Sequence, residues 1–246
     1  MTKRQNFERG FTLIEMIIAV TLVSLLAVGL LMAMHVGLSA LGKSNNRLMS
    51  NRRVMGTQRI LEQQLEGMMP VTADCLGGTP PPAHVVFFEG QPESMRFAST
   101  YSLNEAGRGE PKILEFQVIP GADGEGVRLI VNERLYAGPM SAGALCTGVA
   151  SDPLTGQPAT IFVPIETGPA SFVLADKLLG CRFEYREPVA PGTPEPRWVP
   201  HWVKPYLPDA VRISLTPLDP NPGKLPLMTL TVPIHVTRDP LKEYVN

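Results

Sequence analysis

An uncharged apolar run near the N-terminus constrains this chain more than any other feature of its sequence. Residues 16–34 contain no charged side chain, and mostly small or apolar residues continue to Gly42. An α-helix rises 1.5 Å per residue, so about 20 residues cross the ~30 Å hydrocarbon core of a bilayer. The length and purity of the run predict a membrane-spanning helix over residues 11–42 rather than a buried core helix.

The charges around this run predict its orientation. Three cations, Lys3, Arg4 and Arg9, precede it against the single acid Glu8, and no charge follows directly. This asymmetry places the N-terminus in the cytoplasm and the rest of the chain outside. A secretory signal would instead be cut beyond the run, where residues 37–40 are small enough to permit it.

Glu15 argues against such a signal. It lies four residues inside the apolar segment, and a carboxylate at the centre of a membrane costs about 2.5–3.5 kcal/mol, with less near the interface. An anchor gains nothing from this acid. Glu15 is therefore a candidate functional residue that needs a cationic partner.

The prolines divide the chain near residue 70. All 25 lie at Pro70 or later, and proline disrupts helix interiors. We therefore expect one helix from Thr12 to Met69. Its second half, residues 43–69, is polar with an apolar stripe at Val54, Leu61, Leu65 and Met68, which predicts an amphipathic segment packed on the remaining domain.

Residues 70–246 contain short apolar or alternating runs between Pro- and Gly-rich turns, which predicts a mostly antiparallel β-sheet head. The fold class is therefore α+β, with a long N-terminal helix packed on the sheet. The candidate strands are residues 84–89, 94–99, 113–119, 126–132, 133–137, 159–164, 180–186, 210–216 and 227–236.

Four other segments of the head are expected to be connections. Residues 138–158 are rich in Gly, Ala and Pro and are predicted to form an ordered loop, while residues 187–200 contain five prolines and are predicted to be an extended connector. Residues 170–180 suggest a short helix ending at Gly180. Residues 123–125 resemble a calcium-binding loop only superficially, because the spaced oxygen ligands of such a loop are missing. We therefore expect a turn there.

The segment Arg9-Gly10-Phe11-Thr12-Leu13-Ile14-Glu15 resembles the signal of type IV prepilin-like proteins. The matching parts are the basic leader, the Gly, the Phe, a Glu at the fifth mature position and the long apolar helix. The resemblance implies that a prepilin peptidase removes residues 1–10 by cutting between Gly10 and Phe11 and that Phe11 is N-methylated. It also implies that Glu15 pairs with the N-terminal amine of a neighbouring subunit during assembly. The expected fold is then pilin-like.

Within this family, the head most resembles the J-type minor pseudopilin of type II secretion systems. The resemblance lies in Leu178-Leu179 followed by Arg182-Phe183-Glu184-Tyr185, the pair Trp198 and Trp202, residues 207–213 and Val232-Pro233-Ile234. It implies a non-catalytic subunit of the pseudopilus tip in the bacterial inner membrane, with its head in the periplasm. The implied partners are I-type and K-type minor pseudopilins, the major pseudopilin and the inner-membrane assembly platform.

Two alternatives remain for the function. A minor pilin of a type IV pilus or competence pseudopilus would share the signal and a large β head. A membrane-anchored periplasmic enzyme or binding protein would instead need a pocket of convergent polar groups in the head.

Composition argues against several other classes. With 22 Lys and Arg against 23 Asp and Glu, no basic field is available for nucleic acid. The four histidines, His35, His84, His201 and His235, are isolated, and no nucleophile–base combination, phosphate-binding loop or metal-ligand spacing is found. We therefore expect no catalysis, cofactor or metal. Trp198 and Trp202 are interpreted as packing residues.

The three cysteines are Cys75, Cys146 and Cys181. In an oxidising compartment two of them could pair and leave the third free, but three separately buried thiols are an equal alternative. Their spacing does not choose the pairing.

Overall fold

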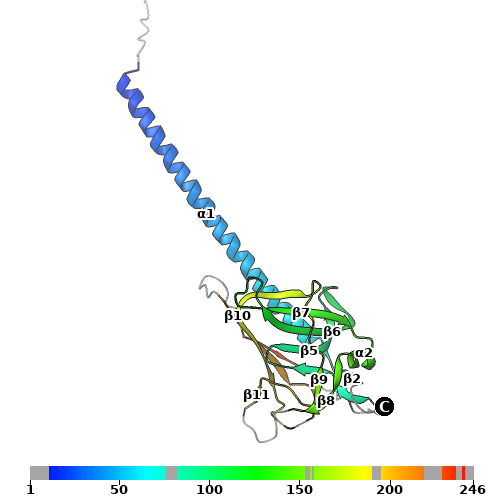
Figure 1. The fold of residues 1–246 in the computed structure, drawn as a ribbon. Helices are drawn as coiled ribbons and strands as arrows, with labels where there is room; N and C mark the ends of the chain where they lie inside the picture. Colours follow the sequence, from blue (N-terminus) through cyan, green and yellow to red (C-terminus); the bar gives the residue numbers. More distant parts are fainter. Residues whose placement is uncertain are drawn as a thin grey trace, which may run out of the picture. The chain divides into compact units, whose positions relative to one another are not determined.

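The computed structural model describes residues 11–75, 82–152, 156, 158–189, 195–218, 229–236 and 240–241. The chain divides into two compact units, residues 1–50 and residues 51–246. The first contains most of one long helix, and the second contains the end of that helix together with a β-sheet head (Figure 1). The α+β, pilin-like fold class expected from the sequence is confirmed.

Helix α1 spans Leu13–Glu66, a continuous run of 54 residues. It ends three residues before the expected position, because Met68–Met69 form strand β1 and pair with β5 (Ser94–Ser102). Gly67 makes the transition, where a Cβ atom would lie 2.7 Å from the Ser99 hydroxyl oxygen. The close approach of the chain to β5 therefore ends the helix at a residue without a side chain.

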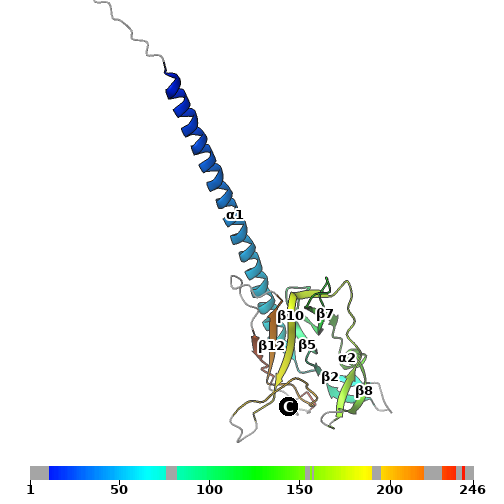
Figure 2. The ribbon, with the colours of Figure 1, turned by 60° about the vertical axis from the view of Figure 1, so that its left-hand side comes forward.

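The main sheet is antiparallel throughout, with the strand order β1-β5-β6-β7-β10-β12-β13 and with β4 and β11 at its margins. Figure 1 shows β5, β6 and β7 side by side, and Figure 2 shows β10 beside β12. The bounds of the remaining strands in this sheet are β4 Phe88–Gly90, β6 Gly107–Pro120, β7 Val127–Leu135, β10 Phe172–Arg186, β11 Trp198–Val199, β12 Ala210–Pro217 and β13 Thr229–Pro233.

The prediction of a short helix over residues 170–180 is wrong, because residues 172–180 belong to strand β10. Its pairing shifts register between Val173 and Ala175, again before Leu178, and once more before Gly180, and Lys177 has a φ of 56°. Each bulge adds a residue to the two-residue period of a strand. The buried residues Ala175, Leu178 and Cys181 consequently recur every three positions, which imitates a helical pattern.

Several predicted strand boundaries also change. The two strands expected at residues 126–132 and 133–137 form the single strand β7, whereas the strand expected at 84–89 divides into β3 (Ala83–Val86) and β4. The predicted connector at 187–200 includes the short strand β11, and its residues 190–194 lie outside the described residues. The closing strand is limited to β13 within the expected 227–236, of which residues 227–228 are not described.

The two faces of the sheet bury two separate hydrophobic clusters. Neighbouring residues of a strand point to opposite faces, and Phe97 lies in one cluster while Ala98 lies in the other. The first cluster joins the sheet to α1 through Leu61 and Leu65, as the apolar stripe predicts. Its other large members include Phe88, Phe97, Phe116, Phe183, Tyr185 and Trp202.

The opposite face of the sheet is covered by a second layer, which we call the cover. It consists of the hairpin of β2 (Thr72–Cys75) with β3, the short helix α2 (Pro139–Gly143), and the hairpin of β8 (Cys146–Ser151) with β9 (Pro158–Phe162). Figure 2 shows α2, β2 and β8 grouped away from β10 and β12. The prediction of an ordered loop over residues 138–158 is therefore wrong, because this segment contains α2 and β8 and contributes side chains to the second cluster.

Candidate functional site

The predicted processing and assembly residues lie at the start of α1. Gly10 lies outside the described residues. Phe11 has an extensively exposed side chain, at 83%, and Thr12 directly precedes the first helical residue, Leu13. The backbone near the predicted cleavage position is thus non-helical at Phe11 and Thr12 and becomes helical immediately afterwards.

Thr12 and Glu15 form a reciprocal capping box. The Glu15 backbone N–H donates to the Thr12 hydroxyl oxygen at 3.4 Å, and the Thr12 backbone N–H donates to Glu15 Oε2 at 3.1 Å. The Thr12 hydroxyl also donates to Glu15 Oε2 at 3.1 Å. Two of the amide groups that a helix start leaves without partners are satisfied in this way.

This box places the Glu15 carboxylate beside the backbone of Thr12, the second residue after the predicted cleavage point. Among the described residues, the donors that reach this carboxylate are neutral. Thr12 was not identified as a site residue from the sequence. The signal was present, since Thr12-Leu13-Ile14-Glu15 is a Thr-x-x-Glu pattern directly before an apolar run.

The apolar part of α1 is long enough and apolar enough to cross a membrane over Leu13–Asn45, on grounds of length and composition. Three of its hydroxyl groups find a partner within the helix: Thr21 donates to the carbonyl oxygen of Ile18, and Ser24 donates to that of Val20. Ser39 donates to the Val36 carbonyl oxygen in the same way. A hydrocarbon environment requires such internal partners.

The head contains a buried charge network on the face of the sheet beneath the cover. Arg96 on β5 has a completely buried side chain, and its Nε donates to Glu115 Oε1 at 2.9 Å while its Nη1 donates to Glu89 Oε2 at 2.7 Å. Glu115 is also buried and accepts a second bond from Arg134 at 3.0 Å. Burial raises the pKa of Glu89, and the nearby Arg96 cation partly opposes this shift.

The geometry of this network indicates a structural ion cluster. Its members lie on adjacent strands, where Arg96 is directly opposite Glu89 on β4 and Glu115 on β6. The third Arg96 nitrogen donates to the Val163 carbonyl oxygen at 3.0 Å, and the guanidinium lies 5.3 Å from the Phe162 ring centre. Each nitrogen of the Arg96 side chain thus donates a hydrogen bond to a group of the head itself, as expected of a structural ion cluster.

The histidines and tryptophans of the head contact different partners rather than one another. His84 pairs with Asp74 at 2.7 Å, and His201 contacts the Gln91 side-chain oxygen at 2.8 Å. Trp202 is buried in the first cluster and donates from its ring nitrogen to the Tyr206 carbonyl oxygen. Trp198 is half-buried beneath the Arg212 guanidinium, 3.8 Å from its ring centre. Within the described ranges, no three His, Cys, Asp or Glu side chains are grouped closely enough to hold a metal ion.

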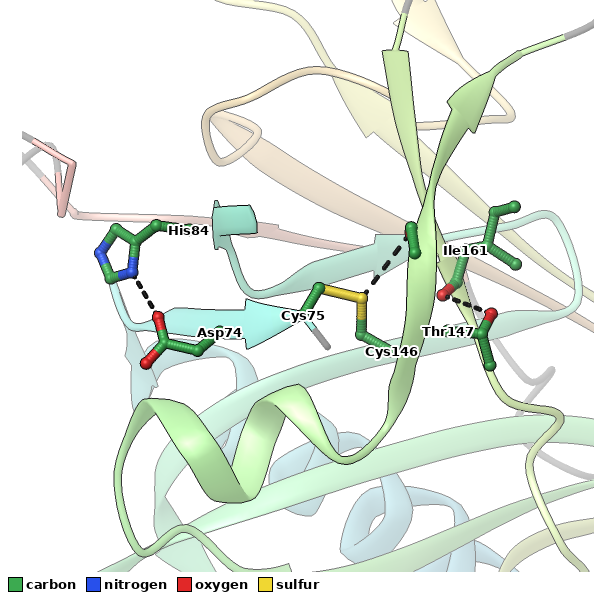
Figure 3. The surroundings of a disulfide bond; sticks show 7 residues. Asp74, Cys75, His84, Cys146, Thr147 and Ile161 are labelled. Carbon is green, nitrogen blue, oxygen red and sulfur yellow. Dashed lines mark hydrogen bonds and ion pairs between the residues drawn. A yellow bond between two sulfur atoms is a disulfide. The ribbon is translucent and has the colours of Figure 1, made fainter. Parts of the chain in front are cut away.

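The structure shows which two cysteines pair and which one is free. Cys75 at the end of β2 and Cys146 at the start of β8 form a disulfide across 71 positions of sequence (Figure 3). Cys181 is a buried free thiol in the first cluster. Burial is the main cause that raises the pKa of the Cys181 thiol to about 12, and the Glu93 charge adds to it.

One comparison with known proteins gives a match at the N-terminus. Residues 5–31 match the family described as the prokaryotic N-terminal methylation motif. The matched segment includes Gly10, Phe11 and Glu15, and it supports a type IV prepilin-like protein that a prepilin peptidase processes and that associates with a membrane. No curated protein and no solved structure matches the chain.

Proposed function

We propose that this protein is a minor pseudopilin, a non-catalytic structural and assembly subunit at the tip of a type II secretion pseudopilus. The observation that carries the proposal is the methylation motif over residues 5–31, which includes Glu15 at the head of a helix long enough to span a membrane. In this proposal the helix anchors the subunit in the bacterial inner membrane, with the head in the periplasm.

The proposed assembly step is an exchange of partners at Glu15. Cleavage between Gly10 and Phe11 removes the basic leader and creates a charged amine, and N-methylation of Phe11 keeps that charge. In the subunit as described, Thr12 satisfies the Glu15 carboxylate with neutral hydrogen bonds. The methylated amine of a neighbouring subunit offers a full charge instead, and such a pair is stronger in a medium of low dielectric. This pairing would set the axial register of the subunits.

The arrangement of the head supports the J-type assignment. The segments that resemble this subtype are distant in sequence, yet β10 pairs with both β11 and β12, and Val211 in β12 pairs with Val232 in β13. Trp202 lies against Tyr185 of β10, with ring centres 6.4 Å apart. The proposed partners are the I-type and K-type minor pseudopilins, the major pseudopilin and the assembly platform.

The proposal is tested by crosslinking in the membrane, followed by pull-down and mass spectrometry. We expect the wild-type chain to be cut before Phe11 and to be recovered with other prepilin-like subunits of a secretion system. Glu15→Val should still be cut but should recover these subunits at least tenfold less well. Glu66→Gln, which removes an exposed acid at the other end of α1, is the matched control and should behave like the wild type.

Two results would overturn parts of the proposal. Normal recovery of partners by Glu15→Val would refute the assembly role of that residue. Recovery of the wild-type chain alone and uncut would refute the pseudopilin assignment, while recovery with pilus subunits and a retraction ATPase would assign it to a type IV pilus.

A further inference from the structure

The cover is made of pieces that are too small to be stable alone. It consists of two two-stranded hairpins and a five-residue helix, and an isolated hairpin is only marginally stable in water. Its apolar side chains are buried against the main sheet, chiefly at Ala98 and Ile113. The members that the cover itself contributes to this cluster include Ala73, Cys75, Ala142, Leu145 and Cys146.

The disulfide between Cys75 and Cys146 joins the two halves of this cover. Strand β2 enters the cover directly after α1 and β1, whereas α2 and β8 follow only after β3 to β7 have been completed. The backbones meet closely beside the bond, because a Cβ atom on Gly143 would clash with the Asp74 carbonyl oxygen. Figure 3 shows the disulfide bridging β2 and the start of β8, with α2 beside it.

Arg96 of the main sheet is in direct contact with the cover. The Phe162 ring shields its guanidinium, which donates to the Val163 carbonyl oxygen. Phe162 is the last residue of β9, and Val163 follows it. If the cover opens, this cation loses a hydrogen bond and a ring contact and meets water. The buried ion cluster is therefore kept dry by the same layer that the disulfide holds together.

We propose that the Cys75–Cys146 disulfide is a redox-sensitive lock on the cover. Without it, the cover opens locally, while the main sheet and its contact with α1 remain folded. The two hydrophobic clusters lie on opposite faces of the sheet, so the first does not require the second. Proteins in general open locally, one cooperative unit at a time, at free energies lower than the free energy of global unfolding.

The locking step requires a disulfide-donating oxidant, either a protein or a small-molecule disulfide. The thiolate of one cysteine attacks the oxidant disulfide to form a mixed disulfide and releases one oxidant thiol. The second cysteine thiolate then displaces the other oxidant thiol, so two electrons and two protons pass to the oxidant. Both cysteines are buried in the closed cover, so this reaction must occur before or during closure.

Cys181 is excluded from this exchange by its position. It lies in the first cluster, on the α1 side of the sheet, and is itself buried. This gives the chain an internal control: removing Cys181 deletes a buried thiol without touching the cover.

The test is hydrogen exchange with mass spectrometry on the full chain in detergent micelles. In Cys75→Ala/Cys146→Ala, we expect amides of β2, β3, α2, β8 and β9 to exchange at least tenfold faster, while those of β6, β10 and β12 stay within twofold of the wild type. Cys181→Ala should leave the cover as protected as in the wild type. Dithiothreitol reaches the buried bond only when the cover opens transiently, so the wild type is reduced until mass spectrometry shows two added hydrogens; it should then reproduce the double variant, and re-oxidation with glutathione disulfide should restore protection.

Two outcomes would overturn the proposal. If the cover keeps wild-type protection after reduction and in the double variant, the disulfide is not its lock. If protection is lost equally throughout the main sheet, the head is one cooperative unit and has no separate cover. Neither result depends on processing at Gly10 or on partner recovery, so it is distinguishable from failure of the pseudopilin assignment.

Discussion

Replacing Arg96 by Met should destabilise the head strongly. The substitution keeps most of the side-chain volume but removes a cation with 0% side-chain exposure that contacts Glu89, Glu115 and the Val163 carbonyl oxygen. Glu115 retains Arg134, whereas Glu89, whose side chain is only 17% exposed, has no other ion pair among the described residues. Breaking a buried ion pair by removing one partner costs about 3–5 kcal/mol, because the remaining charge stays buried.

Thermal unfolding of the full chain in detergent, followed by circular dichroism, measures this loss. For a domain of this size, about 1 kcal/mol shifts Tm by roughly 2–4 °C, so Arg96→Met should lower Tm by about 6–20 °C. Arg134→Met is the matched control. Its side chain is 47% exposed, and an exposed partner should cost no more than about 1 kcal/mol.

A third variant tests the cause of the loss. Arg96→Met combined with Glu89→Gln and Glu115→Gln removes the stranded charges and should recover part of the lost Tm, because neutral side chains are less costly to bury. Equal Tm values for Arg96→Met and Arg134→Met would refute the argument that burial gives this network its energy. So would a triple variant that is less stable than Arg96→Met alone.

Three further predictions concern the capping box, pH and the thiols. Thr12→Val should accelerate amide exchange at Glu15 and cost about 1 kcal/mol of local helix stability, while Thr12→Ser should not. Burial raises the pKa of Glu89 above its value in the unfolded chain, so the folded state binds this proton more tightly, and stability should fall as pH rises from the unfolded to the folded pKa. Glu89→Gln should lack this slope in Tm measurements between pH 4 and 7. Cys181 is buried and its pKa is raised to about 12, so it should resist iodoacetamide at pH 8 in the native chain. After unfolding without reductant, Cys181 should be the one cysteine that is labelled, because the other two are paired. Labelling of Cys75 or Cys146 in the unfolded chain would contradict the pairing.

The extent to which the sequence predicted the fold differs along the chain. Of the predicted apolar stripe, Leu61 and Leu65 are buried helix residues, Met68 is buried but lies in β1, and Val54 is only half-buried. Most strands were located by alternating apolar residues. The strand expected at residues 180–186 is confirmed as the second half of β10, whereas the first half was mistaken for a helix, because its bulges alter the spacing of Ala175, Leu178 and Cys181. Periodicity identifies a strand only while its register is regular.

The candidate site shows the same division on a smaller scale. Glu15 was identified because an acid in an apolar run is costly wherever the helix is placed. The role of Thr12 was missed although its pattern was local. In the head, Arg96 and Glu115 could not be recognised as buried partners, because they are 19 positions apart and meet only when β5 pairs with β6.

The sequence by itself determined the long helix, the candidate membrane span and the motif at its start, because these depend on local composition and on the rise of a helix. The tertiary structure decided the disulfide between Cys75 and Cys146, the cover and the buried charge network. Each of these joins segments that are far apart in the chain, and their pairing is specified by the register of strands packed on both faces of one sheet.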